Sequence, residues 1–399
     1  MKRIGREEYL NKLVTFKDKQ VIKVITGIRR CGKSTLMEIY RDWLKSEGVD
    51  DRQIVYINFE DFDYYELRSP MSLHKYIKPL LQKDKMTYLF FDEIQHVQGF
   101  PDVINSLNLN PLVDIYVTGS NAYMLSSEIA TLLSGRYIEI AMLPLSFREY
   151  LDGIGSECSL QQAYNDYITK SSFPYALDLP SQSAVADYLD SIYNTIVVKD
   201  IVSRKKIQDV MMLEDVIKFT ADNIGNIVST KRIADIMTAD GRRIDQKTVE
   251  RYVTALAETF FVYPAKRYDI KGKQLLKTLG KYYLVDVGLR QMLLGSRSFD
   301  AGRILENVVY LELLRRYKEV YIGKVNSLEV DFVAVSDGGL SYFQVAATVR
   351  DDATLQRELA SLRAVNDQYP KFLLTLDDDP DADYDGIKRI NALAWLAKK

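Results

Sequence analysis

The most informative stretch of the chain reads Gly27-Ile28-Arg29-Arg30-Cys31-Gly32-Lys33-Ser34-Thr35. This stretch satisfies every fixed position of the phosphate-binding pattern G-x-x-x-x-G-K-[ST]. A β-branched run at residues 21–26 precedes it and predicts a buried strand, and apolar residues at helical spacing follow it from Ser34 to Leu44. A strand, a glycine-rich loop and a helix in this order predict a concave loop that binds phosphate at the start of a helix.

Each fixed position of the loop has a chemical reason. Glycines at 27 and 32 allow the backbone to bend so that consecutive N–H groups point into one concavity. The Lys33 ammonium is expected to bridge the β- and γ-phosphates of ATP, and the Ser34 hydroxyl is expected to hold Mg²⁺. The residues expected to bind the nucleotide are Gly27, Arg30, Cys31, Gly32, Lys33, Ser34, Thr35 and Asn121. A turn that carries two glycines and a lysine by chance is the alternative, but it does not explain the flanking strand and helix.

A second signal lies where an apolar run at residues 87–91 meets two carboxylates. The run predicts a buried strand, which delivers Asp92 and Glu93 to the sheet edge where the phosphate loop also lies. Asp92 is expected to bind Mg²⁺, mostly through water, and Glu93 to orient or deprotonate the attacking water. The alternative is a solvated strand end with two carboxylates, which the phosphate loop upstream disfavours.

Composition sets the broad class of the protein. A chain of 399 residues with 47% hydrophobic and 27% charged residues predicts a folded protein of two to four domains. The net charge of −2 does not indicate a nucleic-acid partner, and two cysteines with two histidines exclude a disulfide framework and disfavour a zinc site. Neither a signal peptide nor a membrane-spanning run is apparent, so we expect a cytoplasmic protein with no membrane partner.

Three further segments complete the pattern of this region, namely residues 118–121, Gly135-Arg136 and residues 144–150. With the phosphate loop and the acidic pair, they resemble an uncharacterised group of prokaryotic AAA-type ATPases. The resemblance implies an α/β fold in which a P-loop NTPase domain contains a parallel sheet of order 5-1-4-3-2. It also implies that Arg136 acts as an arginine finger on a neighbouring subunit's nucleotide in a homo-oligomer. A surface ion pair explains this residue at least as simply.

The resemblance covers the whole chain and implies three domains after the ATPase domain at residues 1–151. They are a helical lid at 152–206, a winged helix-turn-helix at 207–290 and an α/β nuclease-like domain at 291–399. In the second of these, three helical patterns precede two strand-like runs at 262–267 and 281–285, joined by a basic loop.

Local charge supports a nucleic-acid role for this middle region. Residues 226–282 contain twelve basic and six acidic residues, a local charge of +6 that suits contact with double-stranded DNA. The residues expected to contact DNA are Lys247, Arg251, Lys271 and Lys273. A protein-docking module with the same fold is the alternative.

The carboxyl-terminal pattern is a long helix, three strand-like runs, a second helix and a last strand. Within it, Glu306, Asp331 and Gln344 resemble the core of PD-(D/E)xK nucleases, in which carboxylates and a lysine hold Mg²⁺ and position water. Gln344 stands where a carboxylate is usual, and Ala346 stands where the lysine belongs. We therefore expect a nuclease-like fold without nuclease activity.

These observations favour an ATP-binding, Mg²⁺-dependent, ATP-hydrolysing AAA-type switch or motor that acts on DNA. One alternative is a DNA-binding regulator that ATP gates with little turnover. A second alternative is an ATP-gated nuclease in which an active-site residue has moved to another position.

Overall fold

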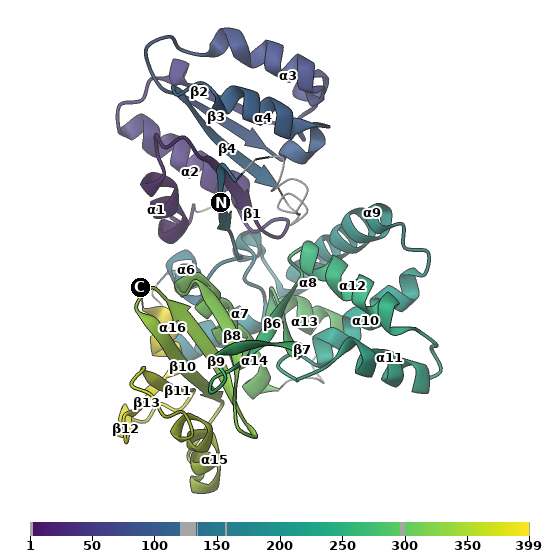
Figure 1. Cartoon of the computed structure of the whole chain (residues 1–399), viewed down its shortest axis with the longest axis vertical. Coiled ribbons are helices and arrows are strands. Elements are labelled where there is room, and N and C mark those ends of the chain that lie inside the picture. The colour runs from purple at the N-terminus through teal and green to yellow at the C-terminus, as the bar shows by residue number, and fades with distance from the viewer. Residues whose placement is uncertain (1–2, 120–132, 134, 156–157, 296–299, 399) are drawn as a thin grey trace. The chain divides into compact units, whose positions relative to one another are not determined.

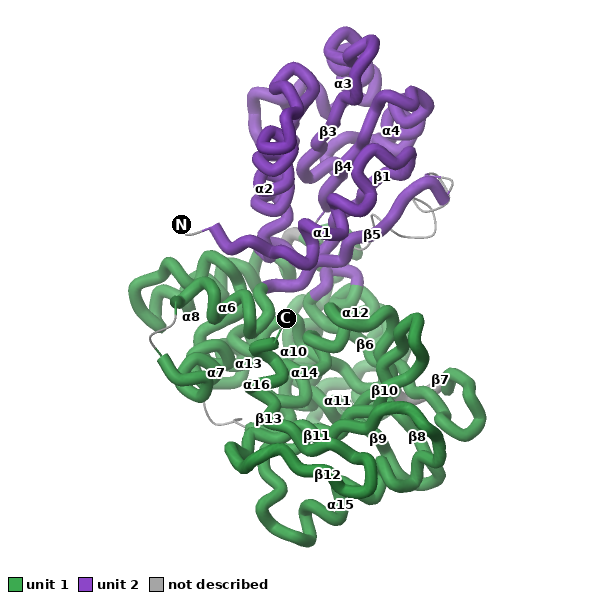
Figure 2. Tube along the Cα trace, turned by 90° about the vertical axis from the view of Figure 1, so that its left-hand side faces the viewer, with its two compact units in different colours: residues 1, 145–257, 261–399 green, residues 2–144, 258–260 purple. Residues whose placement is uncertain are grey.

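The computed structural model describes residues 3–119, 133, 135–155, 158–295 and 300–398 (Figure 1). It divides the chain into two compact units, which Figure 2 colours separately. The N-terminal unit comprises residues 2–144 with residues 258–260, and the C-terminal unit comprises residues 145–257 and 261–399. The finer division into lid, winged helix and nuclease-like domain stays a prediction.

The N-terminal unit is built on a parallel sheet. Its strands are β1 (Ile22–Thr26), β2 (Ile54–Asn58), β3 (Thr87–Asp92), β4 (Val113–Gly119) and β5 (Tyr137–Ala141). They lie in the order β2-β3-β4-β1-β5, and every neighbouring pair is parallel. This order confirms the predicted 5-1-4-3-2 arrangement of a P-loop NTPase, read from the opposite edge.

Helices cover both faces of this sheet. The helices are α1 (Glu7–Thr15), α2 (Lys33–Ser46), α3 (Pro70–Ile77) and α4 (Phe100–Asn108), with short 3₁₀ turns η1 (Asp51–Gln53), η2 (Phe62–Arg68), η3 (Lys78–Leu80) and η4 (Ile94–His96). The helix α3 ends at Ile77, and the chain continues as the 3₁₀ turn η3. Pro79 lacks the N–H that a continuing α-helix needs, so the change in helix type follows from the sequence.

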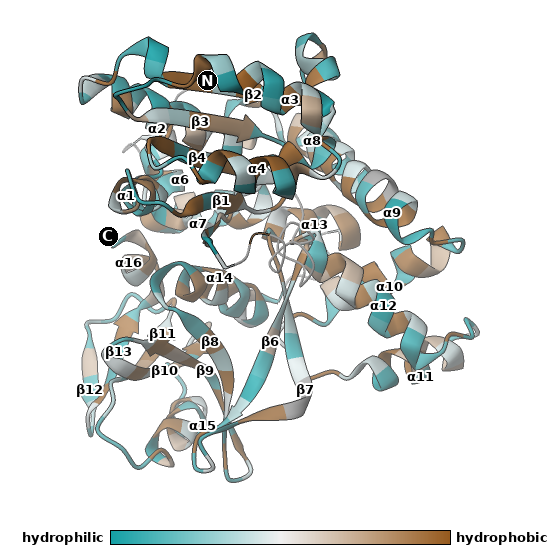
Figure 3. Ribbon diagram, turned by 45° about the horizontal axis from the view of Figure 1, so that its top comes forward, coloured by the Kyte–Doolittle hydropathy of each residue, from teal (hydrophilic) through white to brown (hydrophobic). Residues whose placement is uncertain are grey.

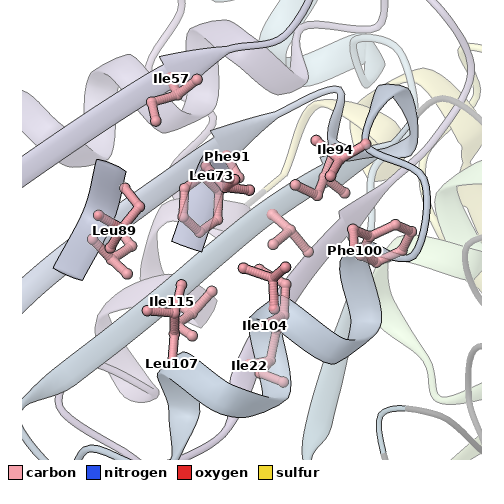
Figure 4. Packing of buried hydrophobic residues seen from close by; sticks show 14 of the residues in the cluster. Ile22, Ile57, Leu73, Leu89, Phe91, Ile94, Phe100, Ile104, Leu107 and Ile115 are labelled. Atoms are coloured by element: carbon pink, nitrogen blue, oxygen red, sulfur yellow. The ribbon is translucent and has the colours of Figure 1, made fainter. Parts of the chain in front are cut away.

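Alternate residues of the strands form an apolar core with α3 and α4. Figure 4 shows Ile104 and Leu107 of α4 lying against Ile22 and Ile115 of the sheet. Every residue of β3 is buried, and its apolar run stands out in the hydropathy colouring of Figure 3. A strand buried on both faces is what a parallel sheet between two helical layers requires.

On the other face of the sheet, side chains of β1 and β4 form a buried polar network. The ammonium of Lys23 forms an ion pair with Asp114, and both side chains are at most 1% exposed. The Asp114 carboxylate also accepts hydrogen bonds from the backbone N–H of Asp18 and the hydroxyl of Tyr116, at 2.9 and 2.8 Å. Burial raises the pKa of Asp114 and lowers that of Lys23, and each partner opposes the effect on the other.

The C-terminal unit combines helices with a mixed sheet. Its helical segments are α6 (Phe147–Ile154), α7 (Leu160–Thr169), η6 (Pro174–Asp178), α8 (Gln182–Asn194), the π-helical η7 (Thr195–Val202), α9 (Ser203–Lys205), α10 (Val210–Asp222), α11 (Thr230–Ala239), α12 (Gln246–Glu258), α13 (Val287–Leu294), α14 (Ala301–Arg316), α15 (Asp352–Arg363) and α16 (Ala392–Ala397). Its strands are β6 (Val262–Asp269), β7 (Gln274–Leu284), β8 (Glu319–Val325), β9 (Leu328–Ser336), β10 (Gly339–Ala346), β11 (Lys371–Thr375), β12 (Ala382–Tyr384) and β13 (Ile387–Asn391).

The strands of the C-terminal unit form one sheet in the order β12-β13-β11-β10-β9-β8-β6-β7. The two strands expected as a wing are β6 and β7, which are longer than predicted and pair with each other as a hairpin. β6 also pairs in parallel with β8, so this hairpin continues the sheet that contains β9 and β10. Among the described residues, no helix combines the length and apolar character that crossing a membrane requires.

Candidate nucleotide-binding site

The phosphate loop connects β1 to α2, as its sequence predicts. Gly27 has a φ of 144°, and a Cβ at this position would lie 2.1 Å from the carbonyl oxygen of Met142. Gly32 has a φ of 103° and stands at the N-cap of α2. Both positions therefore need glycine for conformation, and Gly27 needs it for space as well. Arg30, in the middle of the loop sequence, has a φ of 67° and an exposed side chain.

The Lys33 side chain folds back over the loop. It is 4% exposed, and its ammonium donates to the carbonyl oxygens of Gly27 and Ile28 at 3.0 and 3.1 Å. A phosphate oxygen carries more negative charge than a carbonyl oxygen and accepts a stronger hydrogen bond from an ammonium. The lysine is thus held in the loop by bonds that a bound phosphate can replace.

The carboxylate of Asp92 is fixed by two hydroxyl groups at the end of β3. Thr118 Oγ1 donates to one carboxylate oxygen at 2.5 Å, and Tyr56 Oη donates to the other at 3.1 Å. Asp92 is fully buried. The tyrosine comes from β2 and the threonine from β4, so both neighbours of β3 hold this side chain.

Glu93 follows Asp92 in a left-handed backbone conformation with a φ of 54°. Its backbone N–H donates to Thr118 Oγ1 at 2.9 Å, and its carboxylate accepts a hydrogen bond from the amide of Gln95. One threonine hydroxyl therefore donates to Asp92 and accepts from Glu93, which uses both of its bonding roles. The side chain is 8% exposed at the turn that leaves the sheet.

The other residues predicted for this site differ in how exposed they are. Ser34 and Thr35 occupy the first turn of α2 and are partly exposed, whereas the Cys31 thiol is buried and burial raises its pKa. Arg136 is exposed and precedes β5, where its carbonyl accepts from the N–H of Ile22 at 2.8 Å. Asn121 lies outside the described residues.

The residues present suit a nucleotide-bound Mg²⁺ ion rather than a metal held by protein alone. No group of three or more His, Cys, Asp or Glu side chains in the described part of the chain could hold a metal. Mg²⁺ commonly takes one or two protein ligands and completes its shell with water and phosphate oxygens. The Ser34 hydroxyl and the Asp92 carboxylate are oxygen ligands of this kind.

The four cations expected at DNA are all exposed. Lys247 and Arg251 lie on α12, and Lys271 and Lys273 lie between β6 and β7. The Arg251 guanidinium lies 5.6 Å from the centroid of the Tyr252 ring. Exposure is what contact with phosphates requires, and DNA contact itself stays a prediction.

The nuclease-like residues meet in the C-terminal unit. Gln344 on β10 accepts from the backbone N–H of Asp331 on β9 at 3.2 Å, and the Asp331 carboxylate accepts from the N–H of Val345 at 2.9 Å. Lys281 of β7 lies among the carboxylates, with its ammonium 2.7 Å from Glu306 and 3.5 Å from Asp331. A third carboxylate, Glu329, lies 2.8 Å from the same ammonium.

This cluster is strongly coupled electrostatically. Burial and the neighbouring Glu306 charge raise the pKa of Asp331 to about 8. Burial alone would lower the pKa of Lys281, but attraction by Glu306 and Asp331 raises it overall. The sequence prediction missed Lys281 here, because it lies 50 residues before Asp331 and on a strand assigned to another domain.

The fold and the loop define the class: this is a P-loop NTPase fold with an AAA-type domain. An AAA domain model matches residues 19–151, and a model of a domain of unknown function (DUF8612) matches residues 161–300. A Walker-type ATPase of Pyrococcus abyssi has a similar fold, with a TM-score of 0.50 at 14% identity over 73% of this chain and 96% of its own.

Two relatives match this chain in sequence over most of its length. An uncharacterised protein of Haemophilus influenzae is 38% identical over 399 residues, which cover 98% of each chain. An uncharacterised protein of Methanocaldococcus jannaschii is 29% identical over 327 residues, 78% of this chain and 71% of that protein. The chain belongs to the same family as the Haemophilus protein.

Proposed function

We propose that the N-terminal unit binds ATP with Mg²⁺ and hydrolyses its γ-phosphate, so that the chain works as an AAA-type switch or motor. The observation that carries this proposal is the Thr118 hydroxyl, which holds both the Asp92 carboxylate and the Glu93 backbone. β4, which contains Thr118, lies between β1, which leads into the phosphate loop, and β3. The acidic pair and the loop therefore belong to one edge of the sheet.

Each residue has a defined task in this proposal. The loop amides and Lys33 neutralise phosphate charge, with the ammonium exchanging its two carbonyl partners for phosphate oxygens. Ser34 and Asp92 hold the Mg²⁺ ion, which supplies further charge neutralisation when bound. Gln95 donates to Glu93 Oε2, so a water molecule would be oriented by Oε1 of the same carboxylate.

The test is ATP turnover and ATP binding by Glu93→Gln, with Glu66→Gln on η2 as the control because Glu66 is an exposed carboxylate of the same unit. We expect Glu93→Gln to lower turnover about 10²- to 10⁴-fold, the usual contribution of a general base, while ATP affinity stays near wild type. Turnover by Glu93→Gln at the rate of Glu66→Gln would contradict the assigned role.

A second candidate function is a DNA-binding regulator that ATP gates, and the exposed cations of α12 and the β6–β7 turn support it. We expect affinity for duplex DNA to fall with rising salt, and the double variant Lys271→Ala/Lys273→Ala to lower the logarithmic salt slope by about 2. Lys83→Ala/Lys85→Ala removes two exposed lysines of the N-terminal unit and serves as the control. Equal slopes for both double variants would exclude the turn as a DNA contact.

A further inference from the structure

A buried arginine lies behind the phosphate loop. Arg6 precedes α1 and is 4% exposed, and its guanidinium donates to the carbonyl oxygen of Cys31 at 3.0 Å. A second guanidinium nitrogen donates to the carbonyl oxygen of Leu143 at 2.5 Å. Arg6 therefore joins the loop to the segment that follows β5, and it lies before residue 19, where the AAA match begins.

The segment at residues 142–143, to which Arg6 is bonded, also contacts the phosphate loop. The N–H of Met142 donates to the carbonyl of Thr26 at 2.8 Å, and its carbonyl fills the space where a Cβ of Gly27 would lie. The N–H of Leu143 donates to the hydroxyl of Tyr9 at 3.1 Å. The base of the loop is thus packed against Met142, and the side chains of Arg6 and Tyr9 form hydrogen bonds with the backbone of the next residue, Leu143.

The contact with Cys31 determines how the next amide points. In a planar trans peptide the C=O and the N–H point in opposite directions. Because Arg6 holds the Cys31 carbonyl, the N–H of Gly32 in the same peptide unit points away from Arg6. Gly32 is the N-cap of α2, and an N–H at a helix N-terminus is a donor suited to phosphate.

Arg6 also contributes charge. The charges of Lys33 and Arg6 both act on the buried Cys31 thiol, against the rise in pKa that burial causes. The Arg6 guanidinium carries a positive charge and is almost fully buried, so its field is weakly screened by solvent. A triphosphate in the loop would experience attraction from Lys33 on one side and from Arg6 behind the backbone.

We propose that Arg6 is a positioning residue of the nucleotide site, which aims the Gly32 amide at the phosphates and adds positive potential behind the loop. This inference rests on the proposed ATP binding. It makes the chain before the AAA match part of the nucleotide site. Lysine at this position keeps the charge but cannot hold two carbonyls with a rigid planar fork.

The experiment measures the affinity of a fluorescent ATP analogue with Mg²⁺ for Arg6→Met, Arg6→Lys and Arg3→Ala. Arg3 is the matched control, because it belongs to the same segment but pairs with Glu38 and Asp42 at the surface and is 51% exposed. We expect Arg6→Met to lose about tenfold or more in affinity, the usual scale for hydrogen bonds to a charged group. Arg6→Lys should recover part of that loss, and Arg3→Ala should match wild type.

Thermal unfolding without nucleotide and the ¹⁵N-glycine amide spectrum separate positioning from general stability. We expect Arg6→Met and Arg6→Lys to shift the Gly32 amide resonance. We also expect both variants to remain folded and to bind the ATP analogue more weakly than wild type. Wild-type affinity in the folded Arg6→Met and Arg6→Lys proteins would overturn the role of Arg6, even if their melting temperatures fall. A wild-type protein that does not bind ATP would overturn the proposed function itself, and the Arg3→Ala protein would show the same result.

Discussion

Replacing Gly27 with alanine tests whether the phosphate loop depends on its contact with residues 142–143. An alanine Cβ at this position would lie 2.1 Å from the carbonyl oxygen of Met142, whereas real Cβ contacts stay beyond about 3.0 Å. The carbonyl cannot retreat freely, because the N–H of Met142 donates to Thr26 at 2.8 Å. The φ of 144° at Gly27 adds backbone strain to this overlap.

Gly48 provides the matched control for the size of the effect. It also has a positive φ, 87°, but a Cβ there would meet nothing within 4 Å. Gly48→Ala should therefore lower the free energy of unfolding only by the cost of a left-handed backbone at a residue with a Cβ, about 1–2 kcal/mol. Gly27→Ala should lower the free energy of unfolding by its own backbone strain and by about 1–3 kcal/mol more for the steric overlap. Gly27→Ala should therefore be the more destabilising of the two variants, chiefly because of the overlap with the Met142 carbonyl.

The assay is urea unfolding followed by tryptophan fluorescence. The chain contains two tryptophans, Trp43 on α2 and Trp395 on α16, so a Trp395→Phe background reports on the N-terminal unit alone. ATP binding by the same proteins should fall with Gly27→Ala and persist with Gly48→Ala. Equal unfolding free energies for the two alanine variants would refute the reasoning from Met142.

Two further predictions concern buried charges. Asp114→Ala leaves the Lys23 ammonium buried without its ion-pair partner, so we expect a loss of about 3–5 kcal/mol in urea unfolding, while the double variant Lys23→Met/Asp114→Leu should be much closer to wild type. In the C-terminal unit, the pKa of Asp331 is raised to about 8 from an ordinary value of 3.8, so the folded state binds this proton more tightly than the unfolded state. Its contribution to stability is therefore present at acidic pH and is lost as pH rises toward 8, at up to about 1.4 kcal/mol per pH unit. Asp331→Asn should flatten that dependence when Trp395 fluorescence, in a Trp43→Phe background, follows unfolding between pH 5 and 8.5, and parallel curves for the two proteins would contradict the raised pKa.

The parts of the fold that sequence could predict are those set by local rules. Glycines at fixed spacing, a β-branched strand before them and a helix after them determine the phosphate loop within about fifteen residues. The sheet order came from a family resemblance rather than from residue periodicity, and the pairing of all five strands confirms it. Asp92 was placed at the strand end by the length of its apolar run, and it lies there as the last residue of β3.

Contacts made across the sheet could not be predicted in this way. Tyr56 lies in the interior of an apolar strand, and nothing in its own neighbourhood shows that its hydroxyl reaches Asp92. Thr118 entered the sequence analysis only as part of the segment at residues 118–121, yet it holds both acidic residues. Arg6 is 25 residues before the carbonyl it binds, so only the folded chain reveals the contact.

The same limit affected the interpretation of the nuclease-like cluster. The sequence pattern shows that β10 lacks a lysine, and the structure brings a different lysine, Lys281, to within 2.8 Å of Glu306 and Glu329. A divalent cation entering this cluster would have to approach a buried ammonium of like charge, and its repulsion opposes metal binding. The prediction that this region lacks nuclease activity therefore has two physical grounds. Gln344 supplies no negative charge for a metal, and Lys281 already neutralises part of the charge that Glu306 and Glu329 supply.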